Sequence, residues 1–146
     1  MGGVFLVNFD LDTLLTTEEY ILELDKFHLE RNEHFAINMY FHAATDATKI
    51  LTDDESRKYF LVQFDKYAMF LGTLEEHGIH EDDLKNQRPI VRLSDSKLLS
   101  FAKENMQTQV ANTDRGPISH FVIRTFDQEF HVLSHSDPIV IDMGKK

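Results

Sequence analysis

The sequence predicts an α+β fold: a mostly antiparallel sheet with two helices, over about 53–77 and 95–106, packed on one face. Strand-like apolar runs occupy both ends of the chain, and the two helix-like stripes lie between them. We therefore expect three strands, two helices and three strands, in that order. The 146 residues contain no internal repeat and no linker rich in Pro, Gly or Ser. This indicates a single domain over 1–146, with 144–146 as a frayed tail.

Three strands are predicted in the first 42 residues. An apolar run over 4–9 that ends in polar residues is typical of a buried strand. Apolar residues alternate over about 20–30 and again over 34–42, but the alternation slips by one step between Leu24 and Phe27. Such a slip indicates a β-bulge. One continuous helix is the alternative for this stretch, and it would be exceptionally long for a domain of this size.

The first helix is predicted over 53–77. Thr52 or Asp53 can cap its N-terminus, and Gly78 suits a left-handed C-terminal cap. Apolar residues recur at spacings of three or four and form one stripe: Phe60, Phe64, Tyr67, Leu71 and Leu74.

The second helix and three strands follow. The helix over 95–106 begins at Ser94 or Asp95, and its expected buried face consists of Leu98, Phe101, Ala102 and Met106. Each of the three prolines, Pro89, Pro117 and Pro138, sits just before an apolar β-like run, a position where its missing N–H breaks no central ladder bond. The last strands are expected near 118–126, 129–135 and 138–142.

The composition excludes several classes of protein. The chain carries 15 Lys and Arg against 25 Asp and Glu, a net charge of -10, so bulk nucleic acid and anionic membranes are not expected partners. No apolar stretch approaches the roughly 18–20 residues of a membrane span, and we expect no secretory signal. The absence of Cys excludes disulfides and thiol catalysis and is compatible with the cytoplasm, the location we expect.

A short stretch resembles a catalytic motif. Residues Phe9 to Leu15 read Phe-Asp-Leu-Asp-Thr-Leu-Leu, which resembles the first motif of haloacid-dehalogenase-type phosphatases. The resemblance implies that Asp10 attacks phosphorus, that Asp12 acts as acid and base, and that the pair holds magnesium. The chain departs from the motif at Leu14, where the motif has Thr, and the predicted fold lacks that family's parallel array of strands and helices. We therefore interpret the stretch as a strand exit with an Asp-rich turn.

A histidine cluster is predicted on the C-terminal hairpin. If residues 127 and 128 form a two-residue turn, His120, His131 and His135 share one sheet face, with Arg124 beside them. Three imidazoles are a suitable ligand set for a divalent metal such as zinc, with a fourth position left for water. The alternative is that these are polar side chains on the solvent face of an ordinary hairpin.

A second candidate site lies in a basic segment. Residues 1–83 contain 18 acids and 6 bases, whereas residues 84–124 contain 3 acids and 7 bases, so this segment has a net charge of +4. Guanidinium groups bind phosphate and carboxylate through paired hydrogen bonds. We therefore predict that a small anionic ligand, such as a nucleotide, binds Arg88, Arg92, Arg124 and His131. Charge balance on a solvated surface is the alternative.

Three functional hypotheses follow. No complete catalytic motif is present, which favours a non-enzymatic acidic binding protein, such as an inhibitor, an immunity-type protein or an adaptor subunit, that recognises a basic protein partner. A binder of a small anionic ligand is the second hypothesis, and neither of these needs a cofactor. A metal-assisted hydrolase built on the histidine cluster is the third. Exposed β edges make a homo-oligomer an option under all three.

Overall fold

A computed structural model describes residues 10–31, 35–78, 88–106 and 117–144. These residues form eight strands in two antiparallel sheets, three α-helices and one 3-10 turn. The predominance of antiparallel strands over helices confirms the predicted α+β class. Several predictions fall outside the described residues: the strand over 4–9, Lys85 and Arg115 of the basic segment, and residues 145–146 of the tail.

The first sheet contains the early strands and the last one. Its order is β1 (Ile21–Arg31), β2 (Phe35–Ala44), β3 (Lys58–Asp65) and β8 (Ile139–Asp142). The register between β1 and β2 shifts between Leu24 and Lys26, which confirms both predicted strands and the bulge. The short helix α2 (Ala47–Leu51) follows β2, and the Asp46 side chain caps it by accepting the Lys49 N–H at 2.9 Å.

The second sheet contains the remaining strands. Its order is β4 (Met69–Leu74), β7 (Gln128–Ser134), β6 (Ser119–Arg124) and β5 (Ile90–Leu93). The predicted C-terminal strands are confirmed. The chain leaves this sheet after β7, and β8 pairs with β3 of the first sheet.

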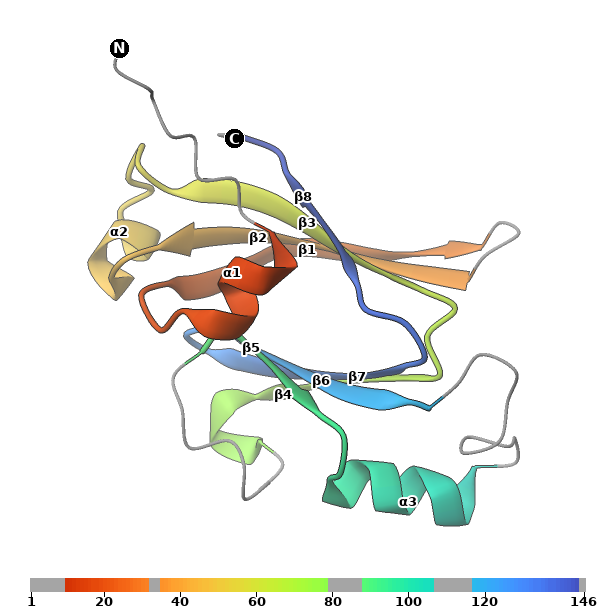
Figure 1. Ribbon diagram of the computed structural model, residues 1–146. Coiled ribbons are helices and arrows are strands. Elements are labelled where there is room, and N and C mark those ends of the chain that lie inside the picture. Colours follow the sequence, from red (N-terminus) through yellow and green to blue (C-terminus); the bar gives the residue numbers. More distant parts are fainter. Residues whose placement is uncertain (1–9, 32–34, 79–87, 107–116, 145–146) are drawn as a thin grey trace.

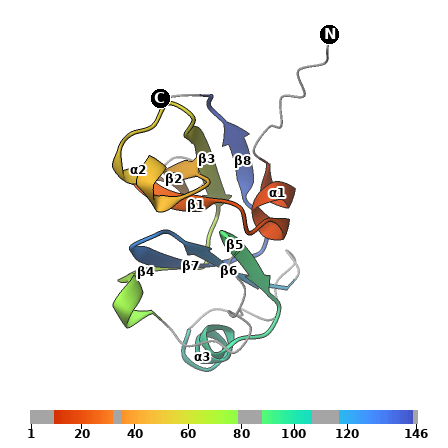
Figure 2. The same ribbon diagram turned by 90° about the vertical axis from the view of Figure 1, so that its left-hand side faces the viewer.

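The two sheets lie face to face, with the core between them (Figures 1 and 2). Residues from both sheets belong to one apolar cluster, in which Phe64 of β3 and Phe121 of β6 have ring centroids 5.4 Å apart. On β6 and β7 the alternate side chains therefore point away from this core, toward the outer face of the second sheet. The predicted histidine cluster lies on that outer face.

The predicted helix over 53–77 is wrong. The segment forms β3, a turn, β4 and the 3-10 turn η1 (Glu75–His77). Lys66 lies in the turn with a φ of 51°, a left-handed conformation that ends the strand, while Gly78 has a φ of -63° and is no left-handed cap. Apolar residues four positions apart lie on one face of a strand as well as on one face of a helix, so the stripe fits both structures.

The second predicted helix is confirmed as α3 (Lys97–Asn105). The helix lies on the outer side of the second sheet (Figure 2). It packs through Leu98, Leu99 and Ala102 against Leu133, whereas Phe101, expected to be buried, is 52% exposed. The prediction that two helices pack on one face is not confirmed, because the other predicted helix does not exist. Among the described helices, none is long and apolar enough to cross a membrane.

The Asp-rich stretch begins a helix rather than a turn. Asp10 caps α1 (Leu11–Thr16), with its carboxylate accepting the Thr13 N–H at 2.8 Å. Leu14 of this helix is fully buried and belongs to the core between the sheets. The helix thus packs at the end of the sandwich near β5, beside a pocket.

Candidate functional site

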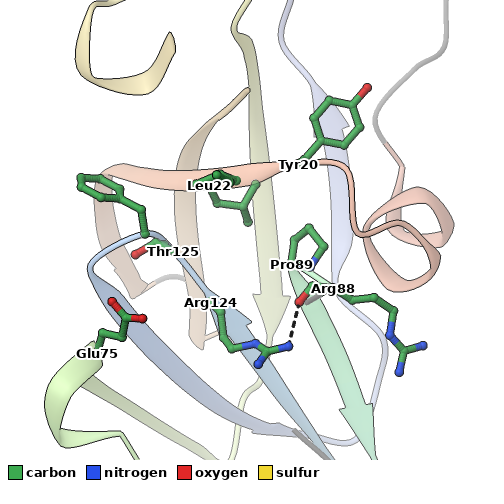
Figure 3. A pocket seen from close by; sticks show the side chains of 9 residues that line it. Tyr20, Leu22, Glu75, Arg88, Pro89, Arg124 and Thr125 are labelled. Carbon is green, nitrogen blue, oxygen red and sulfur yellow. Dashed lines mark hydrogen bonds between the residues drawn. The ribbon is translucent and has the colours of Figure 1, made fainter. Parts of the chain in front are cut away.

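Two of the four predicted ligand-binding residues meet at a pocket. Arg88 and Pro89 lead into β5, and Arg124 and Thr125 end β6. Across from them lies the start of β1, with Tyr20, and the 3-10 turn after β4 adds Glu75 (Figure 3). The pocket has a volume of about 330 Å³, near the lower end of the roughly 300–1,000 Å³ of small-molecule sites.

A backbone contact between the sheets defines one side of this pocket. The N–H of Phe126, in the turn between β6 and β7, donates to the carbonyl of Leu22 on β1 at 3.0 Å. Both residues line the pocket, together with Ile21. The pocket wall therefore combines apolar side chains with backbone from both sheets, and its geometry depends on how the sheets are held together.

The two arginines are anchored by main-chain carbonyls. Arg124 Nη2 donates to the carbonyl of Arg88 at 3.3 Å, as Figure 3 shows, and Arg88 Nη1 donates to the carbonyl of Leu15 on α1 at 3.1 Å. Burial is the largest influence on Arg124 and lowers the pKa of its guanidinium group. The carboxylate of Glu129 raises this pKa, the positive charge of Arg88 lowers it, and the carboxylate of Glu18 raises it. Anchored guanidinium groups lose less conformational freedom when they bind an anion.

The structure does not bring Arg92 to this pocket. Its guanidinium makes an ion pair with Asp137 at 2.7 Å and lies over the Phe121 ring, 5.6 Å from the centroid. The fourth predicted residue is His131, whose side chain lies on the outer face of the second sheet and is fully buried. The basic segment therefore supplies one arginine pair to the pocket rather than a single continuous cluster.

His131 belongs to a buried chain of polar side chains. Ser96 Oγ lies 2.7 Å from His120 Nδ1, and His120 Nε2 lies 2.7 Å from His131 Nδ1. His131 Nε2 lies 2.6 Å from a carboxylate oxygen of Glu129. Ser96 is also the cap of α3 and accepts the Leu99 N–H at 3.0 Å. The chain thus connects the N-terminus of α3 to the second sheet.

The distances in this chain fit the following arrangement of protons. The Ser96 hydroxyl donates to His120, the Nε2–H of His120 donates to His131, and the Nε2–H of His131 donates to a side-chain oxygen of Glu129. Burial, and secondarily the charge of His131, lowers the pKa of His120 to about 3, so this ring is neutral at pH 7.

The register assumed for the histidine cluster is wrong by two residues. Arg124 lies opposite Glu129 rather than His131, and His120 lies opposite Leu133 rather than His135. An even shift keeps side chains on the same face. His120 and His131 therefore still meet, whereas His135 follows the end of β7.

No metal cluster accompanies this pair of histidines in the described part of the chain. There, no three His, Asp or Glu side chains lie together in a way that could hold a metal ion. All four ring nitrogens of His120 and His131 have protein partners, so a metal ion would have to displace one of them. Zinc binding by His120, His131 and His135 stays a prediction.

The buried chain ends beside the pocket. Glu129 is the cross-strand neighbour of Arg124, and its side chain is 13% exposed. Sequence reasoning missed Glu129 and Ser96. The spacing of Glu129 and His131, two residues apart on one strand, was a usable signal that both point to the same face. No signal in the sequence connected Ser96 with His120, which lies 24 residues later.

Comparison of the chain with protein-family models, with curated proteins and with solved structures gives no match.

Proposed function

We propose that this protein is a binding protein that holds a small anionic ligand in the pocket between the two sheets. The observation that carries the proposal is the meeting of Arg88 and Arg124 at one pocket of about 330 Å³. The two arginines come from separate elements, and main-chain carbonyls anchor both guanidinium groups. Guanidinium groups in such a position suit a phosphate or a carboxylate.

The other residues that line the pocket indicate which class of anionic ligand would fit it. Tyr20, Pro89 and Phe126 offer apolar or planar surface, which favours an anion attached to a flat or apolar body. Glu75 contributes a carboxylate to the same wall and so favours a donor, such as a hydroxyl or an amino group, elsewhere on the ligand. A mononucleotide combines these features, with its phosphate on the arginines.

Binding can be tested with matched arginine variants. We expect AMP to raise the melting temperature, because a ligand at 100 times its Kd stabilises the folded state by about 2.7 kcal/mol. Calorimetry with Arg124→Lys and Arg88→Lys should show an affinity lower by about tenfold or more, because lysine cannot form the paired hydrogen bonds. Arg92→Lys, in the same segment but outside the pocket, is the control and should leave the affinity unchanged.

Two results would refute this proposal. One is the absence of any thermal shift with AMP, citrate and inorganic phosphate at millimolar concentration. The other is an equal loss of affinity in Arg92→Lys, which would show that general charge rather than the pocket attracts the anion.

A second candidate function is recognition of a basic protein partner. One observation favours it: around α1, the residues from 10 to 19 include four exposed carboxylates and no base, namely Asp10, Asp12, Glu18 and Glu19. Such a surface speeds encounter with a basic protein and makes the association sensitive to salt. Both functions are compatible in one molecule, because the pocket and this surface are formed by different side chains.

A further inference from the structure

We propose that this protein forms a two-fold symmetric dimer in which the edges of two β1 strands pair antiparallel over residues 26–30. The pairing would join the first sheets of two copies into one continuous sheet. This interaction surface is separate from the pocket residues, so the proposal does not depend on ligand binding.

The open part of β1 is its C-terminal half. Among the described strands, β1 is at the end of its sheet and pairs only with β2. Its N-terminal half is engaged on the other side, where the carbonyl of Leu22 accepts the N–H of Phe126. After the bulge, residues 26–29 are exposed, and the paired ends of β1 and β2 project at the right of Figure 1.

This exposed half carries apolar side chains that a partner strand would cover. Phe27 is 46% exposed and Leu29 is 57% exposed. Both lie on the face of the sheet that is turned toward the second sheet, where the Phe27 ring reaches Phe70 with centroids 5.5 Å apart. An open strand edge with exposed apolar residues is a typical site for pairing with another strand.

The charges on this half of β1 are self-complementary. Lys26, His28 and Glu30 share the outer face of the sheet, because side chains alternate along a strand. With the two-fold axis at His28, each Lys26 lies directly opposite Glu30 of the second copy. On the other face, Phe27 lies opposite Leu29 of the second copy. Directly opposite residues of antiparallel strands have Cβ atoms about 4.5–5.5 Å apart, close enough for ion pairs and apolar contacts.

Neighbouring registers lose this match. An axis between two residues would place side chains from opposite faces against each other, which a continuous sheet does not allow. An axis at Phe27 sets Lys26 against His28, and an axis at Leu29 sets Phe27 against Arg31. Only the axis at His28 pairs opposite charges on one face and apolar residues on the other.

Self-complementarity favours a second copy over an unrelated strand. A two-fold interface uses the same patch on both partners, so each residue pairing occurs twice. Lysine at a strand edge disfavours pairing with strands that lack a matching acid. The second copy supplies that acid, Glu30, at the required position.

Charge exchange tests the proposed dimer directly. Sedimentation of the wild-type chain should show a monomer–dimer equilibrium that depends on protein concentration. Lys26→Glu and Glu30→Lys should each weaken the dimer by about tenfold or more, because each change places like charges together at two symmetric positions. A mixture of the two single variants should form a heterodimer, and the double variant Lys26→Glu/Glu30→Lys should recover the wild-type dimer.

The mixture also separates association from folding. Lys26 lies over the Tyr40 ring, and Glu30 accepts the Asn38 amide at 2.6 Å, so each single change affects the monomer as well. A variant that fails to fold cannot rescue its partner on mixing. Lys103→Glu, the same charge change on the exposed side of α3, is the matched control and should dimerise like the wild type.

Two outcomes overturn the proposal. A wild-type chain that stays monomeric up to the highest soluble concentration shows that a second copy does not bind this edge. A wild-type dimer that persists in both single variants, with no gain on mixing them, shows that the copies associate through another surface.

Discussion

The buried polar chain consists of four side chains from separate places in the sequence, which serve as hydrogen-bond partners for one another: Ser96, His120, His131 and Glu129. Each would be costly to bury alone, since an unpaired polar group in the interior destabilises the fold by about 1–3 kcal/mol. Together they leave no ring nitrogen without a partner. The chain therefore depends on the buried His120 ring staying neutral, and this gives a measurable dependence on pH.

Acidification from about pH 7.5 to pH 5 is expected to lower the free energy of unfolding by about 2 kcal/mol through His120 alone. Burial, and secondarily the charge of His131, lowers its pKa from 6.5 to about 3 in the folded protein. Only the unfolded chain takes up this proton between those values. The stability is therefore fully present above pH 6.5 and is lost as the pH falls toward 3.

Urea unfolding across this pH range measures the effect. His120→Gln should remove this part of the pH dependence, whereas His77→Gln, a change at an exposed histidine, should retain it. A wild-type stability that does not fall between pH 6.5 and pH 5 would contradict the assignment.

At the scale of single residues, the sequence predicted the meeting of two histidines but not their roles. His120 and His131 were placed on one face by alternation along the strands, and the error of two residues in the register preserved that face. Their burial could not be predicted, because α3 covers this face from another part of the chain. The same holds for Arg88 and Arg124, whose meeting depends on how β5 pairs with β6.

Among the elements, α3 offers the clearest test of which helix face packs on the sheet. Leu99 is 1% exposed and Phe101 is 52% exposed, although both are large apolar residues of the same helix. Leu99→Ala should reduce the free energy of unfolding by about 2–5 kcal/mol, because it leaves a cavity. Phe101→Ala should change it by no more than about 0.5 kcal/mol, as expected for a surface position.

Chemical denaturation of the two variants makes this comparison. Equal losses would show that α3 is rotated relative to the described packing. The sequence assigned Phe101 to the buried face because its spacing from Leu98 and Ala102 fits a helical stripe, and that spacing does not say where the sheet lies.

The segment from 53 to 77 shows why one element type was mistaken for another. Phe60 and Phe64 are four residues apart, which suits one face of a helix and also one face of a strand. Val62, between them, is fully buried as well, and this supports the strand. The decisive feature is the turn at Lys66, whose left-handed φ is not signalled by a glycine or an asparagine. Short strands with such turns have few signals in a single sequence.

For the whole molecule, the class of fold was predictable but the division into two sheets was not. Strand patterns and short turns indicated antiparallel pairing, and the C-terminal strands were found in the expected order. Nothing in the sequence of β8 indicated that it pairs with β3 rather than with β7. Pairing between strands that are far apart in the sequence depends on how the complete core packs.

The uneven charge of the whole chain leads to a salt-dependence prediction. A polylysine peptide should bind less tightly by about tenfold or more when NaCl rises from about 50 to 300 mM, because salt screens exposed charges. Fluorescence anisotropy measures the affinity. Glu18→Gln combined with Glu19→Gln should weaken binding at low salt, whereas Asp137→Asn, an acid already paired with Arg92, should have little effect. Binding that is equally tight at both salt concentrations would exclude an electrostatic partner surface.

The buried histidine pair also gives the protein a natural spectroscopic reporter. In the proton arrangement described, each ring carries one N–H proton that is held in a short hydrogen bond away from water. Such protons exchange slowly with solvent, and we expect their magnetic resonance signals at low field, apart from those of the backbone amides. Because Ser96 on α3 lies at one end and Glu129 beside the pocket at the other, these two signals would report detachment of the helix and events at the arginines without any added label.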